Sequence, residues 1–132
     1  MKALLYISAF IVLNATNCSK TTEFKDIKFG EGGGFTGAVT EYEIQTNGDV
    51  FRNNSLNKEH TKIKTLTKSD LKEIQSGINK VSIDAYSFNH PGNIYYFIET
   101  DNKKITWGEP SFKEPKEVKE LYEQLNKIVS TK

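Results

Sequence analysis

Alternating apolar and polar residues predict a β-hairpin in the first half of the chain. The dipeptide Asn47-Gly48 lies between two alternating segments, and Asn-Gly is the strongest short signal for a two-residue hairpin turn. A type I′ turn at this dipeptide sets Ile44 opposite Phe51 and Glu43 opposite Arg52. The expected register therefore places an apolar pair on one face of the hairpin and an ion pair on the other.

A second hairpin is predicted near residue 100. Residues 94–98 (IYYFI) are apolar on both faces, which is typical of a central strand. Residues 101–104 are polar and predict a turn. The returning strand then places Trp107 opposite Ile98.

Two segments with helical periodicity predict amphipathic helices. Thr67 is an expected N-cap, and Asp70 completes a capping-box pair three residues later. The apolar stripe of this helix consists of Leu71, Ile74, Ile78 and Val81. The second helix begins near Pro115, a residue suited to a first helical turn. Its stripe consists of Val118, Leu121, Tyr122, Leu125, Ile128 and Val129.

Together these elements predict a single α+β domain. Shorter strands are expected at residues 24–29 and 63–66, and residues 53–60 are polar and loop-like. The order is strand, hairpin, short strand, helix, hairpin and helix. It predicts an antiparallel β-sheet built from two hairpins plus short strands, with the two amphipathic helices packed on one face.

The most unusual local composition is the glycine-rich run GEGGGFTG at residues 30–37. Residues 32–37 satisfy G-x-G-x-x-G, the pattern that brings a backbone close to a pyrophosphate at a helix N-terminus. Residues 38–44 predict a strand and not a helix, so nucleotide binding is disfavoured. Two interpretations stay open: a loop or bulge whose backbone needs glycine, and a functional loop beside a ligand or partner.

Candidate contact residues for a ligand or partner come from the glycine run and from the aromatic residues of the second hairpin. The set is Gly32, Gly33, Gly34, Phe35, Tyr95 and Trp107. The competing interpretation is that the aromatic residues complete the core or are covered by the glycine loop.

The N-terminal residues have the parts of a secretory signal: a basic residue, an apolar stretch at residues 3–13 and small residues before Cys18. A membrane-spanning helix is disfavoured, because it needs roughly 20 apolar residues and Asn14 interrupts the stretch too early. We expect residues 1–17 to be a cleaved signal peptide, residues 18–23 a lipidated tether and residues 24–132 the folded domain.

At Cys18 the chain resembles bacterial lipoproteins, whose signal peptidase cuts before a cysteine that carries the lipid. Ala15, Thr16 and Asn17 occupy the lipobox positions, with Ala15 and Thr16 inside the usual range and Asn17 outside it. The resemblance implies that Cys18 is lipidated and that the protein is anchored to a bacterial membrane, facing the periplasm or the cell surface. Cleavage nearby followed by simple secretion stays open as the alternative.

Charge and cysteine content exclude several classes of function. The chain has 18 basic and 17 acidic residues and a formal net charge of +1. Its single arginine is Arg52, whereas arginine is the preferred side chain for phosphate and base contacts, so nucleic-acid binding is disfavoured. Cys18 is the only cysteine, so no intramolecular disulfide can form.

Catalytic chemistry finds little support in the sequence. The only histidines are His60 and His90, and the chain contains no G-x-S-x-G motif. A small hydrolase would need His90 and an acidic residue to meet in a pocket. We expect no catalytic residue, no metal and no cofactor, and the residues favour a non-enzymatic protein over an enzyme.

Three motifs extend the resemblance: FGEGGGFTG at residues 29–37, PGNIYY at 91–96 and ITWG at 105–108. With the signal they make the chain similar to an uncharacterised group of small envelope lipoproteins of Gram-negative bacteria. This resemblance implies a shared fold and location and transfers no catalytic residue. The leading hypothesis is a non-enzymatic binding or accessory module held to the membrane through Cys18. The alternatives are an inhibitor or immunity-type protein that binds another envelope protein, and a small hydrolase that uses His90.

Overall fold

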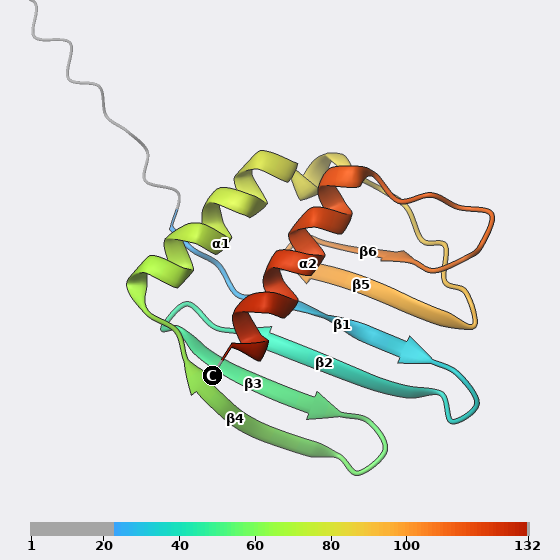
Figure 1. The fold of residues 1–132 in the computed structure, drawn as a ribbon, viewed down its shortest axis with the longest axis horizontal. Coiled ribbons are helices and arrows are strands. Elements are labelled where there is room, and N and C mark those ends of the chain that lie inside the picture. The colour runs from blue at the N-terminus through green and yellow to red at the C-terminus, as the bar shows by residue number, and fades with distance from the viewer. Residues whose placement is uncertain (1–22, 132) are drawn as a thin grey trace, which may run out of the picture.

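The computed structural model describes residues 23–131, which form a six-stranded antiparallel sheet and two α-helices (Figure 1). The expected signal peptide, Cys18 and the tether residues before Glu23 lie outside the described residues. The strands are β1 (Ile27–Gly33), β2 (Ala38–Ile44), β3 (Asp49–Asn54), β4 (Glu59–Thr65), β5 (Ile94–Thr100) and β6 (Lys103–Trp107). The helices are α1 (Lys68–Val81), the short 3-10 helix η1 (Ile83–Ala85) and α2 (Lys116–Ser130). The predicted α+β fold is confirmed, and α1 and α2 cover the same face of the sheet.

The strand order is β4-β3-β2-β1-β5-β6, and every neighbouring pair is antiparallel. β1 therefore lies in the centre and joins the two hairpin units. The β1–β2 turn, the β3–β4 turn and the start of β5 lie at one end of the sheet (Figure 1). The β2–β3 and β5–β6 turns lie at the other end, where the chain enters β1.

The core lies between the sheet and the two helices. Residues paired directly across antiparallel strands share a face, and Phe29 pairs with Tyr42 on one side and Ile98 on the other. Completely buried side chains of this core are Ile27, Phe29, Ile44, Val50, Ile74, Ile98, Ile105, Val118 and Leu125. Burial of each such side chain contributes roughly 1.5–3 kcal/mol. Both predicted helical stripes face this core.

The predicted start of α1 is confirmed. Thr67 Oγ1 accepts a hydrogen bond from the Asp70 N–H at 3.2 Å, and the Asp70 carboxylate accepts one from the Thr67 N–H at 2.8 Å. This capping box satisfies two backbone donors that the first turn leaves without partners. Likewise α2 begins directly after Pro115, which takes the N-cap position.

The predicted register of the first hairpin is wrong by one residue. Ile44 pairs with Val50 and not with Phe51, and Glu43 pairs with Phe51 and not with Arg52. A slip of one residue moves a side chain to the opposite face. Val50 therefore enters the core, and Phe51 lies on the face away from the helices.

The turn conformation explains the shift. A type I′ turn needs φ > 0 at both central residues, but Asn47 does not adopt a positive φ, whereas Gly48 has φ 90°. The Gln45 N–H donates to the Asp49 carbonyl at 2.9 Å, so the loop contains three residues, 46–48. A single left-handed glycine at the end of a three-residue loop replaces the expected two-residue turn.

The second hairpin also has a different register. Trp107 pairs with Tyr96 and not with Ile98, which pairs with Ile105. The turn contains only residues 101–102, because β6 begins directly after them. Because side chains alternate between the two faces along a strand, a shift of two residues leaves Trp107 on the same face of the sheet as Ile98, as expected.

The polar stretch at residues 53–60 is shorter as a loop than predicted. β3 continues to Asn54 and β4 begins at Glu59, so only residues 55–58 form the connection. His60 Nδ1 lies 2.5 Å from Asn53 Oδ1 across the two strands. Polar side chains on the uncovered face of a sheet make such pairs without any apolar pattern in the sequence, which is why the strand was expected to begin only at residue 63.

Candidate functional site

The glycine-rich run is divided between a strand and a turn. Gly32 and Gly33 belong to β1, and Gly34 and Gly37 lie in the β1–β2 turn with φ values of 70° and 63°. A Cβ atom on Gly33 would lie 2.1 Å from the Asn93 carbonyl oxygen. The Gly34 N–H donates to the same oxygen at 2.7 Å. The glycines therefore let the backbone at the end of β1 approach the backbone at Asn93 closely. This supports the interpretation of the run as a segment whose backbone needs glycine.

Two of the candidate residues meet on the face of the sheet away from the helices. Gly32 pairs with Tyr95 between β1 and β5. A Cβ atom on Gly32 would lie 2.6 Å from both Cζ and Oη of Tyr95, so the tyrosine ring fills the space that a side chain would take. An aromatic residue placed across from a strand glycine covers the exposed backbone at that position. The contact between Gly32 and Tyr95 is thus part of the packing of the sheet.

Trp107 lies apart from these residues. It is only 4% exposed and belongs to the core beneath α2. Its ring meets Tyr122 edge-to-face with ring centroids 5.3 Å apart, and Tyr96 lies at 6.0 Å. Burial raises the pKa of Tyr122 to about 12. Trp107 and Tyr95 therefore lie on opposite faces of the sheet and share no surface.

Phe35 is the candidate residue that stands free of the fold. Its side chain is fully exposed, at 108% of its reference area, in the middle of the β1–β2 turn. Leu56 in the β3–β4 turn is 63% exposed, and Ile94 at the start of β5 is 53% exposed. We call these three residues the apolar tip, since their three segments lie at the same end of the sheet (Figure 1).

Hydrogen bonds hold the turns of the apolar tip together. The Ser55 N–H donates to the Val39 carbonyl at 3.0 Å, and the Val39 N–H donates to Ser55 Oγ at 2.8 Å. The bond from Gly34 to Asn93 joins the base of the β1–β2 turn to the start of β5. The tip is therefore supported by the backbone of three segments.

Charge is scarce around the apolar tip. Residues 34–38, 54–58 and 91–94 contain one charged residue, Lys58. Glu59 follows it, and its carboxylate accepts a hydrogen bond from Asn57 Nδ2 at 3.2 Å. In a chain with 27% charged residues, this end of the sheet is suited to apolar contacts.

A hollow of about 510 Å³ lies near the opposite end of the sheet, between α1, the segment that leads into β1 and the β5–β6 turn. Ile27, Ile78 and Ile83 are among its lining residues, but Ile27 and Ile83 are buried, so Ile78 is the accessible isoleucine. Four of its lining residues are acidic: Glu23, Asp26, Asp84 and Asp101. Lys25 Nζ lies 3.8 Å from Asp101 Oδ2. We call this the tether-end hollow, because Glu23, the last residue of the expected tether, is among its lining residues.

His90 does meet an acidic residue, as the hydrolase alternative requires. His90 Nδ1 lies 3.3 Å from Glu109 Oε2, and the imidazole stacks on Phe112 with centroids 4.3 Å apart. Ser111 Oγ, however, donates to Glu109 Oε1 at 2.6 Å. Hydrogen bonds from Ser111 and then His90 hold the pKa of Glu109 below its usual value.

The order of these three groups does not fit nucleophile activation. A histidine that activates a serine stands between the serine and the acid, whereas here Glu109 stands between Ser111 and His90. Both His90 and Glu109 are nearly half exposed. The cluster therefore acts as a surface hydrogen-bond network.

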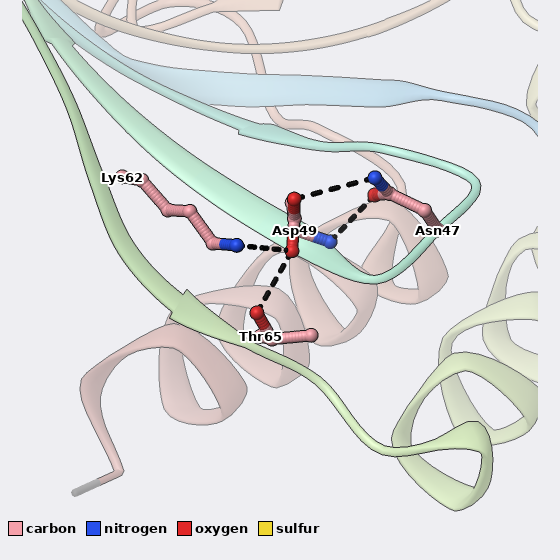
Figure 2. Close-up of polar contacts among 4 residues, drawn as sticks. All are labelled: Asn47, Asp49, Lys62 and Thr65. Atoms are coloured by element: carbon pink, nitrogen blue, oxygen red, sulfur yellow. Dashed lines mark hydrogen bonds and ion pairs between the residues drawn. The ribbon is translucent and has the colours of Figure 1, made fainter.

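Asp49, the first residue of β3, contacts three polar side chains around it, as Figure 2 shows. Its Oδ1 lies 2.7 Å from Lys62 Nζ and accepts a hydrogen bond from Thr65 Oγ1 at 2.8 Å. Its Oδ2 accepts one from Asn47 Nδ2 at 3.2 Å. The bonds from Lys62 and Thr65 hold the pKa of Asp49 below its usual value. Lys62 and Thr65 belong to β4, so their contacts with Asp49 join β3 to β4.

Metal binding finds no support between residues 23 and 131, where no group of three or more histidine, cysteine, aspartate or glutamate residues is close enough to hold an ion. In the same part of the chain no helix combines the length and the apolar character needed to cross a bilayer.

Leu56, Ile94 and the tether-end hollow were not found by reasoning from the sequence. Leu56 did carry a signal, since it is the only large apolar residue in the polar stretch at residues 53–60. Ile94 gave none, because it continues an apolar strand. No protein-family model matches the chain, and a search of curated proteins finds no match either.

Proposed function

We propose that the chain is a lipid-anchored envelope protein that binds another protein through its apolar tip and catalyses no reaction. The observation that carries this proposal is the fully exposed side chain of Phe35 on a turn with a fixed base. Exposed apolar residues that gather at one place mark interaction sites more often than scattered ones do. Phe35, Leu56 and Ile94 come from three separate segments, which the strand order brings to the same end of the sheet.

The turn itself has no need of an aromatic residue at position 35. Gly34 and Gly37 take the positive φ angles, and the Gly34 N–H closes the base of the turn. A polar residue at position 35 would leave these features intact. Burial of a phenylalanine side chain against a partner contributes roughly 1.5–3 kcal/mol. Phe35 is therefore the expected main contact of the tip.

The position of the tip agrees with an anchor at Cys18. Four residues lie between Cys18 and Glu23, and the five residue steps that join them span at most about 17 Å when extended. β1 runs for six residue steps from Ile27 to Gly33. At the rise of a strand, this separates the β1–β2 turn from the start of β1 by roughly 20 Å. A lipid on Cys18 would thus hold one end of the domain near the membrane and leave the opposite end available to a partner.

The tether is tested by the variant Cys18→Ala. Mass spectrometry of the mature N-terminus is expected to find a lipid on Cys18 of the wild type. The variant is expected to leave the membrane fraction. Equal processing and membrane association of the two proteins would contradict the tether.

The binding surface is tested by Phe35→Ser, with Ile63→Ser as the matched control. Ile63 is also an exposed large apolar residue, but it lies in edge strand β4 and outside the apolar tip. Chemical crosslinking in intact cells is expected to give an adduct with wild type and Ile63→Ser, and to lose it with Phe35→Ser. The same adduct in all three proteins would contradict binding through the tip.

A further inference from the structure

We propose that Asn47 is a deamidation site that the folded β2–β3 hairpin keeps closed, so that its conversion marks chains in which this hairpin has opened. The product is an aspartate or an isoaspartate at position 47. The turn lies at the end of the sheet opposite the apolar tip, and the inference does not depend on the proposed function.

The dipeptide Asn47-Gly48 carries the groups that this reaction needs. The backbone nitrogen of Gly48 loses its proton and attacks Cγ of the Asn47 side chain. A carbon–nitrogen bond forms, and the side-chain nitrogen leaves as ammonia. Water then opens the resulting cyclic imide at either of its carbonyl carbons, which gives aspartate or isoaspartate. Glycine favours the attack, because no side chain crowds its nitrogen and its backbone rotates freely.

The fold requires glycine at position 48, so the reactive pair is tied to the structure of the turn. Gly48 has φ 90°, in the left-handed region that favours glycine. A Cβ atom here would lie 2.8 Å from the Leu66 carbonyl oxygen. The Leu66 N–H in turn donates to the Gly48 carbonyl at 2.8 Å. A larger residue would therefore disturb the contact between the turn and Leu66.

In the folded protein the reacting groups are held by hydrogen bonds. Gly48 is buried, and its N–H donates to the Gln45 carbonyl at 2.9 Å. Asn47 Oδ1 accepts a hydrogen bond from the Asp49 N–H at 2.9 Å, and Asn47 Nδ2 donates to Asp49 Oδ2 at 3.2 Å (Figure 2). Loss of the Gly48 proton and rotation of the Asn47 side chain both require these bonds to break. Deamidation therefore requires the hairpin to open.

Either product prevents the turn from closing as before. With aspartate at position 47, a carboxylate oxygen replaces the Nδ2 donor that now lies 3.2 Å from Asp49 Oδ2, and the like charges repel. Isoaspartate instead routes the main chain through its side-chain carbons. This lengthens the three-residue loop 46–48, whose geometry sets the register of β2 and β3. The conversion therefore acts in one direction.

The β3–β4 turn provides an internal reference with the same contacts. Asn57 Oδ1 accepts a hydrogen bond from the Glu59 N–H at 3.1 Å, and Asn57 Nδ2 donates to Glu59 Oε2 at 3.2 Å. The residue between them, Lys58, also has a positive φ, 54°. Because the Lys58 side chain crowds the attacking nitrogen, we expect Asn57 to react much more slowly than Asn47 once the chain is unfolded.

The experiment incubates the purified full-length protein at mildly alkaline pH, in native buffer and in urea, and follows both asparagines by peptide mass spectrometry. In urea we expect Asn47 to be converted and Asn57 to persist. In native buffer the conversion of Asn47 should be slower by about tenfold or more, a ratio that corresponds to only about 1.4 kcal/mol of local opening. Equal rates in the two solutions would overturn protection by the fold. Equal rates for the two asparagines in urea would overturn the site.

A second arm loosens the turn within the folded protein. Asp49→Ala removes the acceptor of Asn47 Nδ2. Asp84→Ala is the control, since Asp84 is an exposed aspartate outside the turn. In native buffer Asp49→Ala should speed the conversion about threefold or more, because the rate follows the population of the open turn. Asp84→Ala should leave the rate unchanged, and circular dichroism checks that both variants are folded. No acceleration by Asp49→Ala would contradict closure of the site by Asp49.

The one-way character is tested with Asn47→Asp and Asn47→Ser. Both replacements retain an oxygen that can accept from the Asp49 N–H, but only aspartate adds a charge. Near neutral pH the urea midpoint of Asn47→Asp should lie below that of Asn47→Ser, and the two should converge toward about pH 2, where the carboxylates are protonated. An Asn47→Asp variant as stable as the wild type at neutral pH would overturn the one-way character.

Discussion

The ammonium group of Lys64 on edge strand β4 lies 2.8 Å from the carbonyl oxygen of Ile128 in the last turn of α2. The same group donates to the carbonyl oxygen of Thr131 just beyond the helix. The last carbonyls of a helix have no partners inside it, and the C-terminal end carries a partial negative charge. One side chain thus connects the edge of the sheet to the final helix.

We expect Lys64→Met to lower the free energy of unfolding by about 1 kcal/mol, because it removes a charge-assisted hydrogen bond at a helix terminus. Urea denaturation monitored by circular dichroism measures the change. Lys72→Met is the matched control, since Lys72 is an exposed lysine of α1. Equal destabilisation by the two substitutions would show that Lys64 does not cap α2.

Gly33, the last residue of β1, and Gly34, the next residue, should respond differently to alanine. Gly33 has φ 99°, and its Cβ would lie 2.1 Å from a backbone oxygen, whereas Gly34 has φ 70° and open space around it. Gly34→Ala is expected to cost about 1–2 kcal/mol, the strain of a left-handed conformation. Gly33→Ala should cost distinctly more, because backbone atoms must also move. Urea midpoints that rank the two variants in the opposite order would contradict the packing of β1 against Asn93.

Asp49 should make the stability depend on acid pH. Its pKa in the folded protein lies below the reference value of 3.8 because Lys62 and Thr65 hydrogen-bond to the ionised carboxylate. A group with a lowered folded pKa contributes stability above its unfolded pKa and loses that contribution as the pH falls through the folded pKa.

Urea midpoints measured from about pH 6 to about pH 2 should therefore fall less steeply for Asp49→Asn than for the wild type. Asp84→Asn is the control, since Asp84 is an exposed aspartate outside this cluster. Parallel curves for the wild type and Asp49→Asn would contradict the ion pair with Lys62.

Tyr122 should make the stability depend on alkaline pH. Burial raises its pKa from 10.0 to about 12. Its contribution to stability is complete below the unfolded pKa of 10.0 and is lost as the pH rises through about 12. Tyr122→Phe should remove this part of the alkaline destabilisation, while Tyr95→Phe should leave it. Titration of tyrosinate absorbance in the folded protein checks the assignment independently.

The sequence predicted the class of the fold and the faces of the helices because those depend on local signals. The capping pair of Thr67 and Asp70 and the stripes of both helices act within one or two turns. Strand registers were predicted less well. The Asn47-Gly48 signal located the turn but not its length, since only the backbone angle of Asn47 distinguishes a two-residue loop from a three-residue loop.

The candidate site was only partly predictable, for a related reason. Gly32 and Tyr95 were chosen as candidate contact residues, and the structure shows that they contact each other in the packing between β1 and β5. Trp107 was grouped with them although the alternation of the strands places it on the opposite face, under α2. Which residues gather at the apolar tip depends on the strand order, and no local pattern encodes that order.

The occupancy of the apolar tip in the cell tests the central claim most directly. In the variant Thr36→Cys, an engineered thiol lies in the exposed turn beside Phe35. Its labelling by a maleimide is compared between intact cells and dilute purified protein. The wild-type protein, labelled in the same way, gives the background signal from Cys18. The control Ser76→Cys on α1 should be labelled equally in both settings. We predict that Thr36→Cys is protected in cells and that adding Phe35→Ser removes the protection. Equal labelling of Thr36→Cys in cells and in dilute solution would contradict a bound tip.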